Sequence, residues 1–202
     1  MQKHSSKNTS INTHHLPAVY NKVNWKHYAH AADDYHVFDI GCGQLATQHL
    51  AYEKLKQFGI KKFFPWDPNH RCMGNKIKTV SEMNKTDTNK VIICTNVLNV
   101  IDDDEVLNNL IAFICNMSVV QEPNGIYHMN PVYITVYEGD KTSIGRETKK
   151  DCWQRNERLS VYLKKFNDYI KSKYNHNANF FKIKYGMIVG VTQYGGHISY
   201  ET

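Results

Sequence analysis

The sequence contains no long hydrophobic run, and this absence excludes the simplest membrane-bound classes of protein. No stretch approaches the roughly 18 apolar residues that a membrane-spanning helix needs. The first residues, MQKHSS, also lack the apolar core of a secretory signal. We therefore expect a cytoplasmic protein that does not bind a membrane.

Cysteine and histidine are present, but they lack the spacing of disulfide or metal sites. The five cysteines are odd in number, widely separated and without a CxxC pair, which favours free thiols in a reducing compartment. The 11 histidines include no HExxH motif and no mixed Cys and His ligand spacing. The sequence predicts neither a bound metal nor a disulfide.

Length and charge indicate one globular domain with a mildly basic surface. A chain of 202 residues is long enough to bury a core. Its net charge of +6 mildly favours an anionic partner such as nucleic acid, although it is far from that of a DNA-coating protein. Residues 1–16 are polar and lack periodicity, so we expect a flexible tail there and a single domain over residues 17–202.

Strand and helix patterns alternate along this domain. A leading helix is expected at residues 16–32, whereas residues 71–83 fit neither pattern clearly. Further strands are expected at residues 36–40, 61–66, 91–94, 131–137, 180–184 and 187–194, and further helices at residues 45–58, 102–117 and 149–174. The order predicts an α/β, Rossmann-like fold: a mostly parallel central sheet with helices on both faces and an antiparallel C-terminal hairpin at its edge.

A glycine loop directly follows the first expected strand. Gly41 and Gly43, with Cys42 between them, would let the backbone approach a ligand at the carboxyl edge of the sheet. The segment GCGQLA also fits the GxGxxG/A fingerprint of dinucleotide-binding proteins, which alone is a weak signal. Asp39 favours a different ligand, because its carboxylate would repel a pyrophosphate but help to hold ammonium and sulfonium groups. S-adenosylmethionine carries both groups.

At these residues the sequence resembles the class I S-adenosylmethionine-dependent methyltransferases, whose first motif is an acidic residue followed by xGxG. In that family the second strand ends in an acid that binds the ribose hydroxyls, and Asp67 stands at that position. Leu45 departs from the fuller pattern, in which a third glycine often occurs there. The resemblance implies that the cofactor is S-adenosylmethionine and that it is bound by Asp39, Gly41, Cys42, Gly43, Asp67, Pro68 and Asn96.

The end of the third strand would line the site of the methyl acceptor. Thr95 and Asn96 lie there, in a TNVLNV segment that, like KKDCWQRN further on, is similar to small methyltransferases of phages and mobile elements. Cys94 lacks the preceding proline of the cytosine-ring methyltransferases, so we expect a buried small residue rather than a covalent nucleophile. Direct in-line transfer would need mainly proximity and electrostatics.

A basic cluster favours nucleic acid, DNA or RNA, as the acceptor. Its cations could hold phosphates while Trp153 stacks on a base and Gln154 or Asn156 reads the edge of that base. The cluster consists of Arg146, Lys149, Lys150, Arg155 and Arg158. These charges could instead form an ordinary solvated helix face. Trp153 could instead be a core residue.

Three functions stay open from the sequence. The first is an active methyltransferase acting on nucleic acid, a small molecule or a protein. The second is a non-catalytic module that binds S-adenosylmethionine or nucleic acid. The third is a nicotinamide oxidoreductase with Tyr and Lys one helical turn apart, as Tyr52 and Lys56 are. Asp39 argues against the third, and methyl transfer would separate the first from the second.

Overall fold

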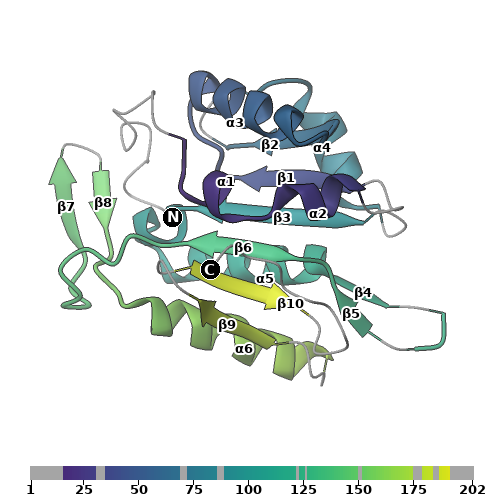
Figure 1. Ribbon diagram of the computed structural model, residues 1–202. Helices are drawn as coiled ribbons and strands as arrows, with labels where there is room; N and C mark the ends of the chain where they lie inside the picture. The colour runs from purple at the N-terminus through teal and green to yellow at the C-terminus, as the bar shows by residue number, and fades with distance from the viewer. Residues whose placement is uncertain are drawn as a thin grey trace.

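A six-stranded sheet between two helical layers organises the chain (Figure 1). The computed structural model describes residues 16–30, 35–68, 72–85, 89–121, 123–125, 127–149, 152–174, 179–183 and 187–191. Nearly all of the expected tail, residues 1–15, lies outside these ranges.

The sheet is mostly parallel and has the order β2-β1-β3-β6-β10-β9. β1, β2, β3 and β6 pair in parallel, whereas β10 pairs antiparallel with both β6 and β9. The strands are β1 His36–Ile40, β2 Lys62–Trp66, β3 Lys90–Thr95, β6 Val132–Thr135, β9 Asn179–Ile183 and β10 Met187–Val191. The α/β class, the mostly parallel sheet and the C-terminal hairpin are confirmed. The hairpin lies at the edge of the sheet, as expected, with β9 as the edge strand and β10 between β9 and β6.

Successive strands are added to opposite sides of β1. From β1 it crosses through α3 (Leu45–Gln57) to β2 on one side, and then through α4 (Lys76–Met83) to β3 on the other side. The carboxyl ends of β1 and β3 therefore form a topological switch point, where open α/β sheets bind their ligands. The glycine loop lies at this point because it follows β1 directly.

Two hydrophobic layers cover the two faces of the sheet. Successive strand residues point to opposite faces. Phe38 and Ile92 pack with α4, α5 and α6, whereas Val37 and Val91 pack with α1, α2 and α3. Asp39 is two residues after Val37 in β1, so its side chain points to the same face of the sheet, towards the second layer and α1. The remaining helices are α1 Val19–Lys22, α2 Trp25–His30, α5 Asp104–Ser118 and α6 Leu159–Tyr174.

The leading helix is interrupted rather than continuous. Val23, between α1 and α2, has an extended backbone with φ −82° and ψ 136°. The break lets Tyr20 stack on Trp25 with ring centroids 6.1 Å apart, and Trp25 Nε1 donates to the Tyr20 carbonyl oxygen at 3.0 Å. The two short helices lie across the face of the sheet near β1 and β3 (Figure 1).

The expected helix over residues 149–174 is wrong in its first part. α6 begins only at Leu159, and the preceding segment forms the antiparallel hairpin of β7 (Arg146–Lys149) and β8 (Cys152–Gln154). Trp153 therefore does not belong to a helical stripe. It packs against Gly145, where an added Cβ would lie 2.2 Å from the Trp153 ring. The hairpin projects at the carboxyl end of the sheet (Figure 1).

A second small hairpin, which the sequence analysis did not predict, lies at the opposite end. β4 (Val119–Gln121) and β5 (Tyr127–Met129) come between α5 and β6 and project at the amino end of β6 (Figure 1). Each strand has three residues, which is too short for an alternating pattern to be read from the sequence.

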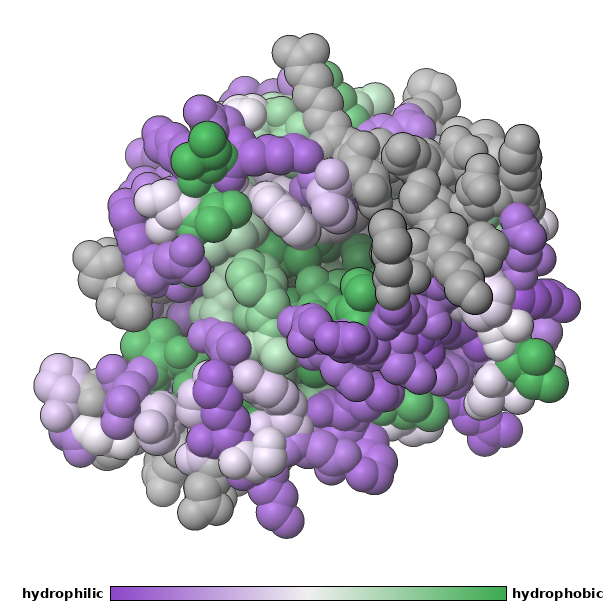
Figure 2. Space-filling view, turned by 180° about the vertical axis from the view of Figure 1, so that it is seen from behind, coloured by the Kyte–Doolittle hydropathy of each residue, from purple (hydrophilic) through white to green (hydrophobic). Residues whose placement is uncertain are grey.

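Seen from the side opposite to that of Figure 1, the surface contains a hollow with hydrophobic side chains, set in mostly hydrophilic surroundings (Figure 2). Among the large hydrophobic side chains exposed on the helices are Ile77 and Val80 on α4 and Phe113 on α5. Within the described ranges, no helix combines the length and hydrophobicity that crossing a membrane requires.

Candidate functional site

The glycine loop, residues 41–43, is tied to the end of β2. The Gly41 and Cys42 amides donate to the Trp66 carbonyl oxygen at 2.7 and 3.3 Å, and the Gly43 amide donates to Asp67 Oδ2 at 3.0 Å. Both glycines have positive φ, 75° and 70°, a region that glycine adopts without steric cost. All three loop amides are therefore bonded to the protein itself.

The two glycines have different surroundings. A Cβ added to Gly41 would lie 2.2 Å from Val97 Cγ2, in the segment that follows β3. A Cβ added to Gly43 would meet no described atom within 4 Å. Gly41 thus permits close packing of the loop against the neighbouring strand end, whereas the described part of the chain leaves space beside Gly43.

Asp39 lies under α1 and is only 3% exposed. The Tyr20 hydroxyl of α1 donates to Asp39 Oδ2 at 2.6 Å. Asp39 Oδ1 is also buried, and no described residue forms a hydrogen bond with it. Burial raises the pKa of the Asp39 carboxyl to about 7; the Asp67 carboxylate adds to the rise and the Tyr20 hydrogen bond opposes it.

Asp67 brings a second buried carboxylate to the same loop. Besides the bond from Gly43, its main-chain amide donates to Cys72 Sγ at 3.2 Å and its carbonyl oxygen accepts from Lys76 Nζ at 2.5 Å. Pro68, the next residue, is exposed. Asp67 therefore bonds the glycine loop directly, whereas Asp39 bonds Tyr20 on α1; the two carboxyl groups are close enough for Asp67 to raise the pKa of Asp39.

Gln48 is a loop-binding residue that the sequence analysis missed. This fully buried side chain of α3 donates from Nε2 to the Gly43 carbonyl oxygen at 2.7 Å and accepts at Oε1 from the Met73 amide at 2.7 Å. It connects the loop to the segment that precedes α4. The sequence shows only a glutamine on the side of the helix that is buried. Its partners lie in other segments of the chain, so the sequence does not reveal them.

Thr95 and Asn96 lie at the carboxyl end of β3, at the same edge of the sheet. Thr95 is buried, whereas Asn96 is exposed with φ 55°, a left-handed conformation that asparagine tolerates well. The Asn96 amide donates to the Thr135 carbonyl oxygen at 2.8 Å. Asn96 therefore presents its side chain at the edge, next to Val97 and the glycine loop.

Gln154 and Asn156 are buried within the protein. Gln154 Oε1 accepts from Asn99 Nδ2 at 3.2 Å, and Gln154 Nε2 donates to the Tyr137 carbonyl oxygen at 3.0 Å. Asn156 Nδ2 donates to the Ile144 carbonyl oxygen at 2.9 Å. In this structure both side chains fasten the β7–β8 hairpin to its neighbours.

The expected basic cluster is divided between surface and interior. Arg155 is 7% exposed, donates to the carbonyl oxygens of Ile101 and Asp102, and forms ion pairs with Asp104 at 2.8 Å and Glu157 at 3.5 Å. It is therefore not a surface cation. Arg146 and Arg158 are exposed, whereas the Lys149 side chain and Lys150 lie outside the described part of the chain.

The five cysteines are free thiols, and all of them are buried, including Cys94, for which a buried position was expected. Burial raises the pKa values of the Cys42 and Cys94 thiols, which disfavours the reactive thiolate at both positions. Within the described ranges, no three or more His, Cys, Asp and Glu side chains are grouped so as to hold a metal ion.

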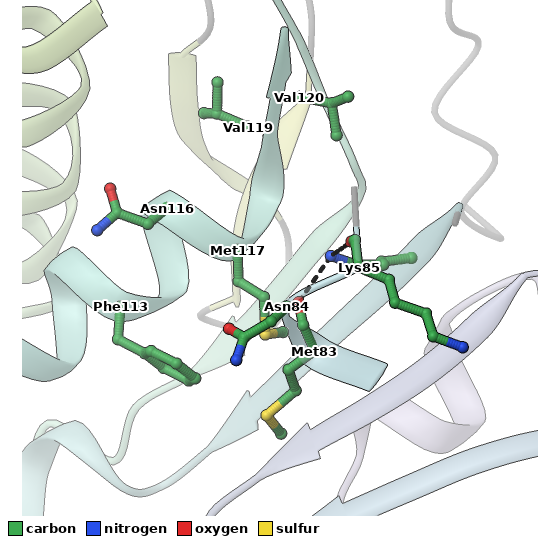
Figure 3. Close-up of a pocket in the computed structure, with 9 residues that line it drawn as sticks. Met83, Asn84, Lys85, Phe113, Asn116, Met117, Val119 and Val120 are labelled. Carbon is green, nitrogen blue, oxygen red and sulfur yellow. Dashed lines mark hydrogen bonds between the residues drawn. The ribbon is translucent and has the colours of Figure 1, made fainter. Parts of the chain in front are cut away.

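A cavity of about 290 Å³ lies at the other end of β3 (Figure 3). Its lining includes Met83, Phe113, Met117 and Lys90, whose ammonium donates to the Met83 carbonyl oxygen at 2.8 Å. Lys90 begins β3 and Thr95 ends it, so the length of that strand, roughly 17 Å, separates this cavity from the glycine-loop edge.

Comparison with known proteins gives no relative. No protein-family model, no curated protein and no solved structure matches this chain.

Proposed function

We propose that this protein is a Rossmann-like, S-adenosylmethionine-dependent methyltransferase. The observation that carries the proposal is a pair of buried, interacting carboxyl groups beside a glycine loop at the switch point of a mostly parallel sheet: Asp39, two residues before the loop, and Asp67, which bonds the Gly43 amide. Such switch points are where folds of this kind bind ligands. Two carboxylates so placed favour a cationic ligand with hydroxyl groups over a phosphate.

The residues present fit this cofactor. Asp39 Oδ1, which has no hydrogen-bond partner among the described residues, can accept from an ammonium group. The space beside Gly43, which no described atom fills, would admit a ligand, and Asp67 would hold the ribose hydroxyls. Cys42 belongs to the loop itself, and Pro68 and Asn96 follow the ends of β2 and β3 at the same edge of the sheet. S-adenosylmethionine, when bound, supplies a methyl group on a positively charged sulfur.

The loop amides argue against a nicotinamide dinucleotide. Phosphate-binding loops present free main-chain N–H groups to the anion. Here the Gly41 and Cys42 amides bind the Trp66 carbonyl oxygen, and the Gly43 amide binds a carboxylate. A pyrophosphate at this loop would have to displace Asp67 and would meet its negative charge.

The protein would contribute to methyl transfer by aligning the cofactor with the acceptor. The loop fixed by Gln48 and Asp67 would hold the cofactor at one side of the edge, while Thr95 and Asn96 would position the acceptor at the end of the adjacent strand. The acceptor atom gains the methyl group, and its proton is released to solvent. Positioning of this kind can supply much of the rate enhancement without a catalytic base.

Nucleic acid stays the proposed acceptor, with Arg146 and Arg158 as the members of the basic cluster that are exposed in the described part of the chain; Arg146 also pairs with Asp140 at 3.5 Å, a surface ion pair with which a phosphate could compete. If they contact phosphates, affinity should fall steeply between low and moderate salt, and Arg146→Ala with Arg158→Ala should flatten that dependence by about one unit of slope for each lost contact. A salt-independent activity on a neutral small substrate would contradict nucleic acid as the acceptor.

Labelled methyl transfer tests the proposed activity. The protein would be incubated with isotope-labelled S-adenosylmethionine and separate pools of DNA, RNA, protein and small metabolites, and products would be detected by mass spectrometry. We expect labelled product in one pool, and about tenfold less of it with Asp67→Ala when the cofactor concentration is below the parent's Kd. Cofactor binding without transfer to any pool would instead favour a non-catalytic binding module.

A further inference from the structure

The environment of Asp39 points to an additional residue in the cofactor site. Oδ2 accepts a 2.6 Å hydrogen bond from the Tyr20 hydroxyl, while Oδ1 is buried with no partner among the described residues. A buried acceptor without a hydrogen bond destabilises the protein unless a ligand or water satisfies it. The carboxylate is thus held at one oxygen by the protein, and its other oxygen is left for a donor.

The Tyr20 hydroxyl is held in place by the packing of the two N-terminal helices. The Tyr20 ring is completely buried and stacks on Trp25 at 6.1 Å, and Trp25 Nε1 donates to the Tyr20 carbonyl oxygen. Because both the ring and the main chain of Tyr20 are fixed, its hydroxyl can reach Asp39 from one direction only. This direction determines which carboxylate oxygen stays available.

We propose that Tyr20 is a positioning residue of the cofactor site, which orients Asp39 so that Oδ1 accepts a hydrogen bond from the ammonium group of the cofactor's amino-acid part. This inference rests on the proposed function and extends it, because it makes α1 part of the site. A cationic donor is the partner that a buried carboxylate oxygen prefers, since charge-assisted hydrogen bonds are about twice as strong as neutral ones.

Two ligands distinguish a positioning role of Tyr20 from a general effect of its substitution on the stability of the protein. S-adenosylhomocysteine carries the amino-acid part, whereas 5′-methylthioadenosine lacks it. In calorimetric titrations, Tyr20→Phe should bind S-adenosylhomocysteine about three- to tenfold more weakly than the parent protein and should bind 5′-methylthioadenosine within about twofold of it. Tyr28→Phe is the matched control. It removes another buried hydroxyl of the same helical pair, one that bonds Tyr133 at 2.5 Å instead of Asp39.

A double-variant cycle adds a second readout that does not depend on activity. Asp39→Asn should weaken S-adenosylhomocysteine binding by about tenfold or more, and adding Tyr20→Phe to it should change the affinity by less than about twofold, because the two residues act through one contact. Melting temperatures of all variants would establish that they are folded.

The outcomes distinguish this inference from the proposed function. Equal loss of both probes in Tyr20→Phe, or additive effects in the double variant, would overturn the role of Tyr20 and leave the proposed function standing. If the parent protein binds neither probe, the proposed function fails and this inference fails with it.

Discussion

Gly41 and Gly43 have the same left-handed backbone but different surroundings, so one substitution at each separates backbone strain from packing. Alanine in a left-handed conformation costs roughly 1–2 kcal/mol. At Gly41 it would also collide with Val97, which adds about 1–3 kcal/mol of overpacking. Gly41→Ala should therefore destabilise the protein clearly more than Gly43→Ala in urea unfolding. Equal losses would mean that the loop does not pack against the end of β3.

Asp39 predicts a defined pH dependence of stability. Its carboxyl keeps a proton in the folded protein up to about pH 7, whereas an unfolded aspartic acid loses it near about pH 3.9. Between these values the folded state binds more protons, so the contribution of Asp39 to the free energy of unfolding falls as pH rises, by at most about 1.4 kcal/mol per unit. Above about pH 7 the fall is complete.

Asp39→Asn isolates this contribution, because the amide does not titrate. Urea unfolding of the parent protein and the variant between pH 4.5 and 8 should show the parent losing stability relative to Asp39→Asn up to about pH 7, with a constant difference above it. Asp168→Asn, an exposed carboxylate on α6, is the control and should track the parent. A difference that does not change with pH would contradict the buried environment of Asp39.

Single residues of the site could be predicted where the signal is local. Asp39, Gly41, Gly43 and Asp67 stand at fixed distances from strand ends, and the structure brings all four together. The other residues that hold them were not predictable in this way. Tyr20 contacts Asp39 across 19 positions of sequence, and no short-range pattern encodes that contact.

At the scale of elements, Arg155 joins the β7–β8 hairpin to the start of α5. Its guanidinium satisfies two main-chain carbonyl oxygens and pairs with Asp104. Arg155→Met should cost about 2–4 kcal/mol, because buried groups lose their partners, which corresponds to a fall in melting temperature of about 5–15 °C for a domain of this size. Arg158→Met, at an exposed position, should stay within about 0.5 kcal/mol of the parent. Equal effects would show that Arg155 is not buried.

The same region explains why the long helix was mispredicted. Residues 149–158 carry helix-compatible side chains, but Asn156 has φ 58°, which a helix cannot contain. The first turn of α6 is fixed from outside, since the Leu159 amide donates to Glu138 Oε1 at 2.7 Å. A cap supplied from a distant segment leaves no signal next to the helix that it begins.

At the scale of the whole molecule, alternation of strands and helices was enough to predict parallel pairing but not the order of strands. β1, β2 and β3 are joined by crossover connections through helices, which place strands parallel in one sheet. The position of β10 between β6 and β9 depends on pairings between segments more than 50 residues apart, such as Val189 with Tyr133. Such pairing is decided by the assembled sheet and not by the hairpin that contains β10.

Calorimetric titration with S-adenosylmethionine tests the central claim, that the two carboxylates and the glycine loop form a site for this cofactor. We predict that the parent protein binds S-adenosylmethionine and does not bind NAD, and that Asp39→Ala and Asp67→Ala each weaken binding by about tenfold or more. Asp168→Ala should bind as the parent does. If both loop variants bind S-adenosylmethionine like the parent protein, or if the parent protein binds NAD instead, the assigned site is wrong.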